Sequence, residues 1–225
     1  MLSKLKAILR RKRPFFRRDP NRFLRRVHGV IHVGANTGQE RHLYEKHGLR
    51  VLWIEPIPEI FEKLKANLAA FPPQRALQGL VTDQDGADYS FHVSNNDGLS
   101  SSLLDFNQHK DIWPDVTFEK TITLRSHTLS SLLEQERIDP ADYDALVMDT
   151  QGSELLVLQG AAPLLKHFTY IKTEVPDFEA YAGCCRVADI AQFLERHGFK
   201  ELSRFPFALH PHGGRYYDVV YQRQL

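Results

Sequence analysis

Short apolar runs alternate along the chain with segments in which apolar residues recur every three or four positions. The short runs have the length of buried strands and are bounded by glycine or polar residues. They lie at residues 30–33, 51–54, 76–81, 145–148, 168–175, 199–205 and 216–221. Between them, apolar stripes at 60–68 and 187–194 predict helices with one buried face, and the second of these ends at Gly198.

Strands that alternate with helices predict an α/β fold with an open, mostly parallel sheet. Period-two alternation at 89–93 and again at 117–124 interrupts this order and indicates a hairpin-like insertion. The last two runs, 199–205 and 216–221, have no helix between them. We therefore expect an antiparallel C-terminal hairpin at one edge of the sheet.

Basic residues are concentrated at the start of the chain. The 225 residues hold 29 Lys and Arg against 28 Asp and Glu, but residues 1–26 hold 11 of the basic residues and only one acid, Asp19. This asymmetry predicts a basic N-terminal arm at 1–26 and a net acidic domain at 27–225. The arm is either a solvated helix or a site for an anionic partner. If the arm binds an anionic partner, the acidic domain and the absence of a groove of aromatic and basic residues favour an anionic membrane surface over nucleic acid.

Composition excludes several classes of protein. Hydrophobic residues at 42% and charged residues at 25% are globular values, which exclude wholesale disorder. No apolar run reaches the length of about 18 residues that a membrane-spanning helix needs. Cys184 and Cys185 are adjacent and would pair only with strain, so we expect reduced thiols and a cytoplasmic location. The absence of HExxH and of Cys/His ligand spacing predicts no metal site.

Candidate chemistry follows the predicted strands, because ligands of open α/β sheets bind outside the carboxyl ends of the strands. A turn from Gly34 to Gly38 follows the first strand, where missing side chains expose backbone N–H groups to a ligand. Glu55 and Pro56 follow the second strand, and a carboxylate there can accept both hydroxyls of a ribose. Together they favour an adenosine-containing cofactor. Asp149 ends the strand at 145–148 and would face the reactive end of that cofactor.

Rival functions stay open at this step. The turn has the form GxNxG rather than the GxGxxG of dinucleotide-binding proteins, which argues against a dinucleotide. A nicotinamide-dependent oxidoreductase remains an alternative, because it would use the same turn and the same acid. A non-catalytic cofactor-binding module that acts through its basic arm is another.

Three segments in order carry a family resemblance. The segments 33–38, 54–58 and 149–155 resemble those of the FkbM family of S-adenosylmethionine-dependent methyltransferases. A serine-rich stretch at 100–103, Thr128 with Leu129, and Glu174 fall where that family has its serine-rich loop, its TLD segment and its later strand-end glutamate. The resemblance covers residues 30–205 and leaves the arm outside.

The resemblance implies a Rossmann-like class I methyltransferase fold that binds S-adenosylmethionine. It places the glycine turn against the methionine part of the cofactor, Glu55 on the ribose hydroxyls, further residues beside the adenine, and Asp149 in the methyl-transfer cleft. The cofactor-binding set is then Gly34, Ala35, Asn36, Gly38, Glu55, Pro56, Leu80, Val81, Asp83 and Asp149.

The sequence also departs from the family pattern at three positions. His32 stands where an acid is common before the glycine turn, Ser130 replaces the aspartate of TLD, and Val147 stands where a lysine is frequent. None of these changes touches Glu55 or the glycines.

The expected reaction is transfer of a methyl group to a hydroxyl of a sugar, a glycan or a small metabolite. A hydroxyl acceptor loses its proton as it attacks, so the site needs a base. We expect Asp149 and Glu174 to be the catalytic residues, with His210 and His212 as other candidate bases. Aromatic residues of the last two strands are candidate walls of the acceptor pocket: Phe205, Phe207, Tyr216 and Tyr217.

Overall fold

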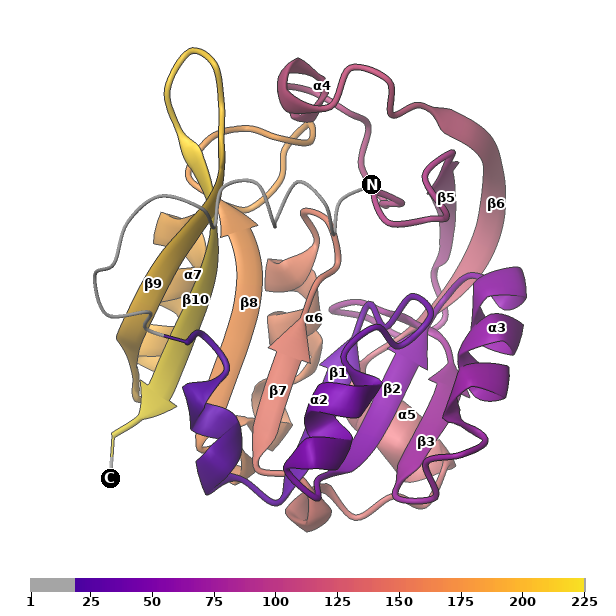
Figure 1. Ribbon diagram of the computed structural model, residues 1–225, viewed down its shortest axis with the longest axis vertical. Coiled ribbons are helices and arrows are strands. Elements are labelled where there is room, and N and C mark those ends of the chain that lie inside the picture. The colour runs from indigo at the N-terminus through magenta and orange to yellow at the C-terminus, as the bar shows by residue number, and fades with distance from the viewer. Residues whose placement is uncertain (1–18, 225) are drawn as a thin grey trace.

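A seven-stranded sheet forms the centre of the protein (Figure 1). The structure, a computed structural model, describes residues 19–224. The strand order is β3-β2-β1-β7-β8-β10-β9. The strands are β1 (Gly29–Val33), β2 (Arg50–Glu55), β3 (Gln74–Gln78), β7 (Ala145–Met148), β8 (Tyr170–Pro176), β9 (Phe199–Leu209) and β10 (Arg215–Arg223).

The pairing confirms the predicted sheet. The pairs β1–β2, β2–β3, β1–β7 and β7–β8 are parallel, whereas β10 is antiparallel to both β8 and β9. The chain leaves β1 toward β2 and later returns to the other side of β1 with β7. The strand order therefore reverses between β1 and β7, which is where an open α/β sheet forms its ligand crevice.

Helices cover both faces of this sheet (Figure 1). Alternate residues of β1 supply the two cores: Ile31 and Val33 pack with apolar residues of α5, α6 and α7, and Val30 packs with those of η2, α2 and α3. The helices of the first core are α5 (Leu129–Gln135), α6 (Glu154–Gly160) and α7 (Val187–Arg196). Those of the second are the 3-10 helix η2 (Arg22–Arg26), α2 (Arg41–Lys46) and α3 (Pro58–Leu68). Two further 3-10 helices are η3 (Pro140–Asp142) and η4 (Ala162–His167).

A smaller sheet lies beyond the carboxyl ends of the parallel strands. It consists of β4 (Leu80–Val81), β5 (Asp88–Ser94) and β6 (Phe118–His127), and α4 (His109–Ile112) lies in the connection between β5 and β6 (Figure 1). The antiparallel pairing of β5 with β6 confirms the predicted hairpin-like insertion. The predicted single strand at 76–81 was wrong. The chain leaves β3 at Gly79, and Leu80 and Val81 pair with β6 instead.

The packed part of the chain begins inside the predicted basic arm. Residues 1–18 lie outside the described range, but Phe23 and Leu24 of η2 are 4% and 1% exposed and belong to the second core. Arg25 and Arg26 on the same helix are exposed. The boundary drawn from charge at residue 26 therefore differs from the structure, because the apolar pair anchors a basic helix on the sheet.

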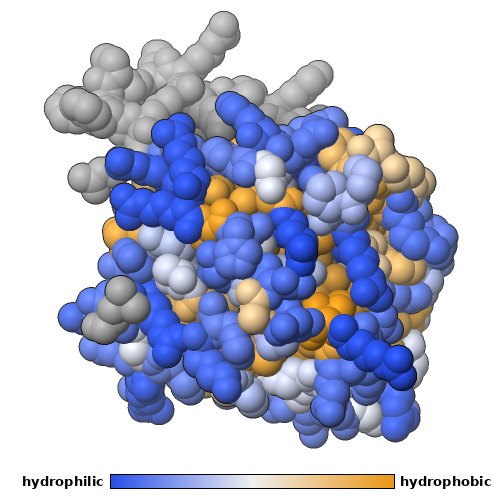
Figure 2. Space-filling view, turned by 90° about the horizontal axis from the view of Figure 1, so that it is seen from below, coloured by the Kyte–Doolittle hydropathy of each residue, from blue (hydrophilic) through white to orange (hydrophobic). Residues whose placement is uncertain are grey.

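The face at the amino ends of the parallel strands is mainly hydrophilic, with smaller apolar areas between the polar side chains (Figure 2). Within residues 19–224, the large hydrophobic side chains that are exposed are Leu202 and Leu209, both on β9. No helix in this range has the length and apolar character needed to cross a membrane.

We predict that Leu24→Ala lowers the free energy of unfolding by about 2–5 kcal/mol, because it leaves a cavity in the second core. Leu202→Ala is the control, since Leu202 is 52% exposed and its truncation leaves no cavity. Chemical denaturation of both variants measures the difference. Equal effects of the two substitutions would contradict the packing of η2 on the sheet.

Candidate active site

A cavity of about 420 Å³ opens at the carboxyl ends of β1, β2 and β7. Its volume lies in the range of small-molecule sites. Most of the predicted cofactor residues line it: Gly34, Ala35, Asn36, Glu55, Pro56, Leu80, Val81 and Asp149. Gly38 and Asp83 do not. The sequence thus located the cavity but assigned two residues to it that lie elsewhere.

Gly34 lets β1 and β7 come together at the floor of this cavity. Its φ is 81°, in the left-handed region, and a Cβ atom there would lie 2.0 Å from the carbonyl oxygen of Asp149. The Asp149 N–H in turn donates to the Val33 carbonyl. A residue with a side chain at position 34 would separate the two strand ends that form the site.

Gly38 and Asp83 have structural positions instead. A Cβ atom on Gly38 would lie 2.8 Å from Cδ1 of Leu64, so this glycine permits close packing of α3 on the turn. Asp83 is exposed beyond the end of β4, where its backbone packs against Gly160 of α6. Neither residue lines the cavity, so their assignment to the cofactor stays a prediction.

Glu55 is a buried carboxylate at the tip of β2. It is 4% exposed, and its two oxygens accept hydrogen bonds from the N–H groups of Asn36, at 2.8 Å, and Ile57, at 3.0 Å. Burial raises the pKa of Glu55 to about 7, although both hydrogen bonds act in the opposite direction. Each oxygen keeps a second lone pair for a ligand, so the carboxylate can accept two further hydrogen bonds from the cavity.

His32 lines the same cavity in place of an acid. Its ring stacks on Trp53 with centroids 4.8 Å apart, and Nδ1 lies 3.0 Å from the hydroxyl of Tyr44. Burial, with a smaller contribution from Lys172, lowers the pKa of His32 to about 3. The ring is therefore neutral at pH 7 and offers a hydrogen bond but no charge.

A second buried carboxylate, Glu154, organises the loop after β7. Glu154 is 0% exposed and accepts hydrogen bonds from the N–H groups of Thr150 and Gly152. The Cys185 thiol lies 3.4 Å from the same carboxylate. Burial raises the pKa of Glu154. These contacts hold the loop in the left-handed conformation of Gln151, whose φ is 54°.

Gln151 connects Asp149 to Tyr181 and to the serine-rich loop. Its Nε2 donates to Oδ1 of Asp149 at 2.5 Å, and its Oε1 accepts from the hydroxyl of Tyr181 at 2.7 Å. The Ser102 hydroxyl donates to the Gln151 backbone carbonyl at 2.8 Å. The serine-rich loop belongs to the insertion. Its hydrogen bond therefore attaches the insertion to the loop that carries Asp149.

Glu174 lies beside a second, smaller cavity of about 70 Å³. Leu99, Asp149 and Gln151 line both cavities, so the two meet at Asp149. The structure thus brings the two predicted catalytic carboxylates to one place. Tyr216 and Phe207 also line the smaller cavity, as predicted for acceptor walls, whereas Phe205 and Tyr217 do not.

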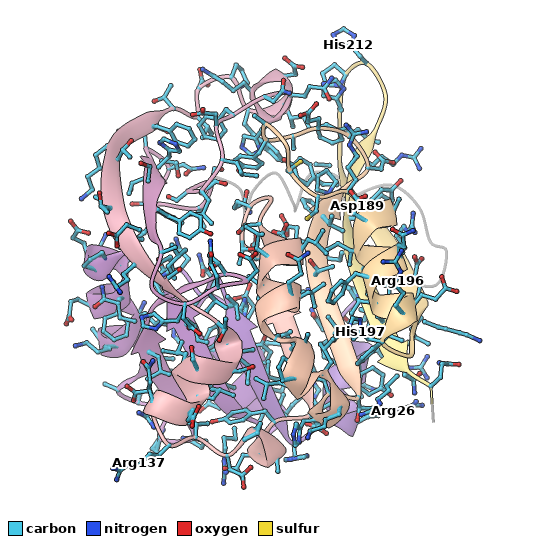
Figure 3. The ribbon with its side chains drawn as sticks, turned by 180° about the vertical axis from the view of Figure 1, so that it is seen from behind. Arg26, Arg137, Asp189, Arg196, His197 and His212 are labelled. Carbon is cyan, nitrogen blue, oxygen red and sulfur yellow. The ribbon has the colours of Figure 1, made fainter. Side chains whose placement is uncertain are left out.

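The histidines of the β9–β10 loop do not face either cavity. His210 is 5% exposed, and its Nε2 lies 2.9 Å from Asp111 while its Nδ1 lies 2.9 Å from the carbonyl of Gly213. His212 lies at the tip of the hairpin, at the extreme end of the molecule (Figure 3). The structure therefore places neither candidate base beside Asp149 and Glu174, because the long hairpin extends past the two cavities.

The other two departures from the family pattern lie outside the cavities. The Ser130 hydroxyl donates to the carbonyl of Gly160 and so joins α5 to α6. Val147 is packed in the second core, where it is the strand partner of Lys172 on β8. Within residues 19–224, no group of three or more His, Cys, Asp or Glu side chains is arranged to hold a metal ion.

Local sequence pattern does not indicate two residues beside the site. His109 and Trp113 come from a segment without regular periodicity, and they line the smaller cavity only because the insertion folds against β10, where His109 meets Tyr216. The position of Glu154 at the end of the segment 149–154 could have suggested that it holds the loop in place. A carboxylate near an irregular turn accepts hydrogen bonds from the free N–H groups of that turn.

A comparison with protein-family models finds the methyltransferase FkbM domain over residues 32–201. No curated protein sequence matches the chain.

Solved structures show the same fold at low identity. TrmK of M. capricolum in complex with S-adenosylhomocysteine is 8% identical with a TM-score of 0.53, over 93% of this chain and 69% of that one. An uncharacterised protein of Listeria monocytogenes is 10% identical with a TM-score of 0.51, over 88% of this chain. The alignment spans 62% of the Listeria protein. The tRNA methyltransferase TrmK of B. subtilis is 9% identical with a TM-score of 0.50, over 91% of this chain and 63% of that one.

We predict that Gly34→Ala lowers the free energy of unfolding by about 1–3 kcal/mol more than Gly183→Ala does. Both glycines have positive φ, 81° and 70°, so both substitutions carry a similar backbone strain of about 1–2 kcal/mol. Only at Gly34 does the new methyl group meet another atom within 3 Å, because nothing lies within 4 Å of a Cβ on Gly183. Thermal and chemical denaturation compare the two variants, and equal losses would show that the approach to Asp149 is not tight.

Proposed function

The chain belongs to the FkbM methyltransferase family, and on this premise we propose that it methylates a hydroxyl of a sugar, a glycan or a small metabolite. The family assignment makes the chain an S-adenosylmethionine-dependent methyltransferase, and its fold is that of the class I enzymes. The observation that carries the proposal is the meeting of two half-buried carboxylates, Asp149 and Glu174, at the boundary between the larger and the smaller cavity.

The residues of the larger cavity fit the cofactor. Glu55 presents two free lone pairs to hydroxyl donors, and the hydroxyl of Thr150 is buried in the lining without a hydrogen-bond partner in the described structure. We propose that Glu55 binds the ribose hydroxyls and that the turn from Gly34 to Asn36 holds the methionine part. Leu80 and Val81 then offer an apolar border to the adenine.

S-adenosylmethionine supplies an electrophilic methyl group. The protein aligns the acceptor and excludes water, because a displacement of this kind depends mainly on the positions of the reacting atoms. We propose that Asp149 or Glu174 accepts the proton of the acceptor hydroxyl. Gln151 holds the Asp149 carboxylate by its 2.5 Å hydrogen bond, so Asp149 cannot turn away from the boundary without breaking that contact.

The nicotinamide-dependent alternative has less support. It rests on the glycine turn and on Glu55, and both also belong to the methyltransferase family that the chain matches over residues 32–201.

We predict that wild-type protein binds S-adenosylhomocysteine and that Glu55→Gln weakens this binding by about 1–3 kcal/mol, because an amide accepts fewer hydrogen bonds than a carboxylate. Since the pKa of Glu55 is about 7, the wild-type affinity should rise from pH 6 to pH 8 as the carboxyl ionises and then become constant. The affinity of Glu55→Gln should not vary in this way. Calorimetric titration measures both effects.

Glu59→Gln is the matched control for this titration. Glu59 lies four residues further along the chain, is exposed and pairs with Lys120 on the outside of the protein. An equal loss of affinity in both variants, or an unchanged pH dependence in Glu55→Gln, would remove Glu55 from the cofactor site. Tight binding of NADH without binding of S-adenosylhomocysteine would support the oxidoreductase.

We also predict transfer of labelled methyl from S-adenosylmethionine to hydroxyl acceptors in a panel of glycosides and hydroxylated metabolites. The comparison of Asp149→Asn with Glu174→Gln identifies the base. The variant that removes the base should lower kcat by about 100-fold or more. The other substitution should change mainly the KM of the acceptor. Transfer to amines alone, with silence toward all hydroxyl acceptors, would contradict O-methylation.

A further inference from the structure

The smaller cavity contains two polar groups that have no partner. Nε2 of His109 and Nε1 of Trp113 are buried and make no hydrogen bond within the described residues, and the two residues that carry them line this cavity. A buried polar atom without a partner is destabilising, and native structures hold few of them. Two such atoms on residues that line one cavity, beside the carboxylates proposed for catalysis, indicate a site that a ligand completes.

The ring of His109 is fixed in its plane. His109 opens α4, is 3% exposed and lies stacked on Phe106 with centroids 5.2 Å apart. Tyr181 and Trp113 contact the ring with centroids at 5.0 and 4.6 Å. The hydroxyl of Tyr216 lies 2.8 Å from Nδ1. Aromatic contacts and one hydrogen bond thus leave Nε2 as the single unused polar atom of the ring.

The bond to Tyr216 also determines which nitrogen carries the proton. If Nδ1 carried it, the Tyr216 hydroxyl hydrogen and the Nε2 lone pair would both lack a partner. If the Tyr216 hydroxyl donates to Nδ1, only the Nε2–H group lacks one. The second arrangement leaves fewer unsatisfied groups, so Nε2 is a donor. Burial lowers the pKa of His109 to about 4, which keeps the ring neutral at pH 7.

The cavity therefore combines two N–H donors with two carboxylates. An amine has no lone pair for the donors once it is protonated, and an anion would be repelled by Asp149 and Glu174. A hydroxyl group accepts from an N–H and donates to a carboxylate at the same time. Neighbouring oxygens of an uncharged hydroxylated acceptor match both halves of the cavity.

We propose that this cavity is the acceptor subsite, in which His109 Nε2–H and Trp113 Nε1–H bind an oxygen of an uncharged, hydroxylated acceptor beside the carboxylates. The inference rests on the proposed methyl transfer and names the residues that select its acceptor. His109 and Trp113 are substrate-binding residues in this site. Tyr216 is a positioning residue that acts through His109.

The test compares Trp113→Phe and Tyr216→Phe with wild type in methyl transfer to the glycoside that reacts fastest in the panel. Each variant should raise the KM of the acceptor on the order of tenfold, because one hydrogen bond to a buried group is lost or misdirected. The affinity for S-adenosylhomocysteine should stay within twofold, since neither residue lines the larger cavity. Tyr217→Phe is the control, because the Tyr217 hydroxyl bonds Asp177 and lies outside both cavities.

A double variant separates binding from a structural role. His109→Phe combined with Tyr216→Phe removes the unsatisfied N–H and its supporting hydroxyl together, and replacing both partners by apolar groups is near neutral or stabilising. We expect a melting temperature equal to or above that of wild type, together with loss of glycoside methylation. A marked fall in melting temperature would assign these residues to the core and overturn the subsite.

The outcomes also distinguish this inference from the function on which it rests. Binding of methyl glycosides can be followed by ligand-observed NMR, with S-adenosylhomocysteine present and no turnover. Glycoside binding or methylation that Trp113→Phe and Tyr216→Phe leave unchanged would overturn the subsite while leaving methyl transfer in place. Absence of glycoside binding would overturn the assigned acceptor class. Absence of S-adenosylhomocysteine binding would instead contradict the proposed function.

Discussion

The close approach of Gly34 to the Asp149 carbonyl determines where every other part of the site can lie. It brings the ends of β1 and β7 together at the point where the strand order reverses, with Val33 and Asp149 joined by a backbone hydrogen bond. Glu55 reaches the same place because β2 pairs with β1 in register through Ile54, and its carboxylate accepts from Asn36 in the turn that Gly34 begins. The missing side chain of Gly34 thus permits a floor at which Glu55, at the end of β2, and Asp149, after β7, lie on either side of β1.

Two buried carboxylates have different tasks in this arrangement. Glu154 accepts N–H groups of its own loop and makes contact with Cys185, so its hydrogen-bonding capacity is used within the protein. Glu55 has the same degree of burial but only one backbone donor on each oxygen. The first group holds the loop that carries Asp149 and Gln151. The second keeps lone pairs for a ligand, and the difference follows from how many loop N–H groups converge on each side chain.

The sequence predicted those parts of the fold that depend on local pattern. The runs at 30–33, 51–54 and 145–148 are buried strands because their neighbours cover both faces, and the residues after them line the cavity as expected. The sequence does not show that the strand predicted at 76–81 is two strands. Leu80 and Val81 are as apolar as the β3 residues, and only their pairing with β6 makes them a separate strand. Gly38 lies in a glycine-rich turn of the kind that binds ligands, but its missing side chain makes room for Leu64 of α3.

The smaller cavity, proposed as the acceptor subsite, was not predictable from local pattern for a physical reason. His109 and Tyr216 are separated by 107 positions in the chain, and their hydrogen bond exists only because α4 folds over the start of β10. The unsatisfied Nε2 is a property of that packing and of nothing in the neighbouring sequence.

Both cavities therefore have a lining residue whose charged form burial disfavours, Glu55 with a pKa of about 7 and His109 with a pKa of about 4. Desolvation disfavours the charged form of each, so the protein is more stable while both are neutral. Hydroxyl groups of a ligand reduce that penalty at Glu55, where they donate to the ionised carboxylate. At His109 a ligand oxygen accepts from the neutral ring and needs no change of charge. Cofactor binding is thus linked to pH near neutrality, whereas acceptor binding through His109 is independent of pH in the same range.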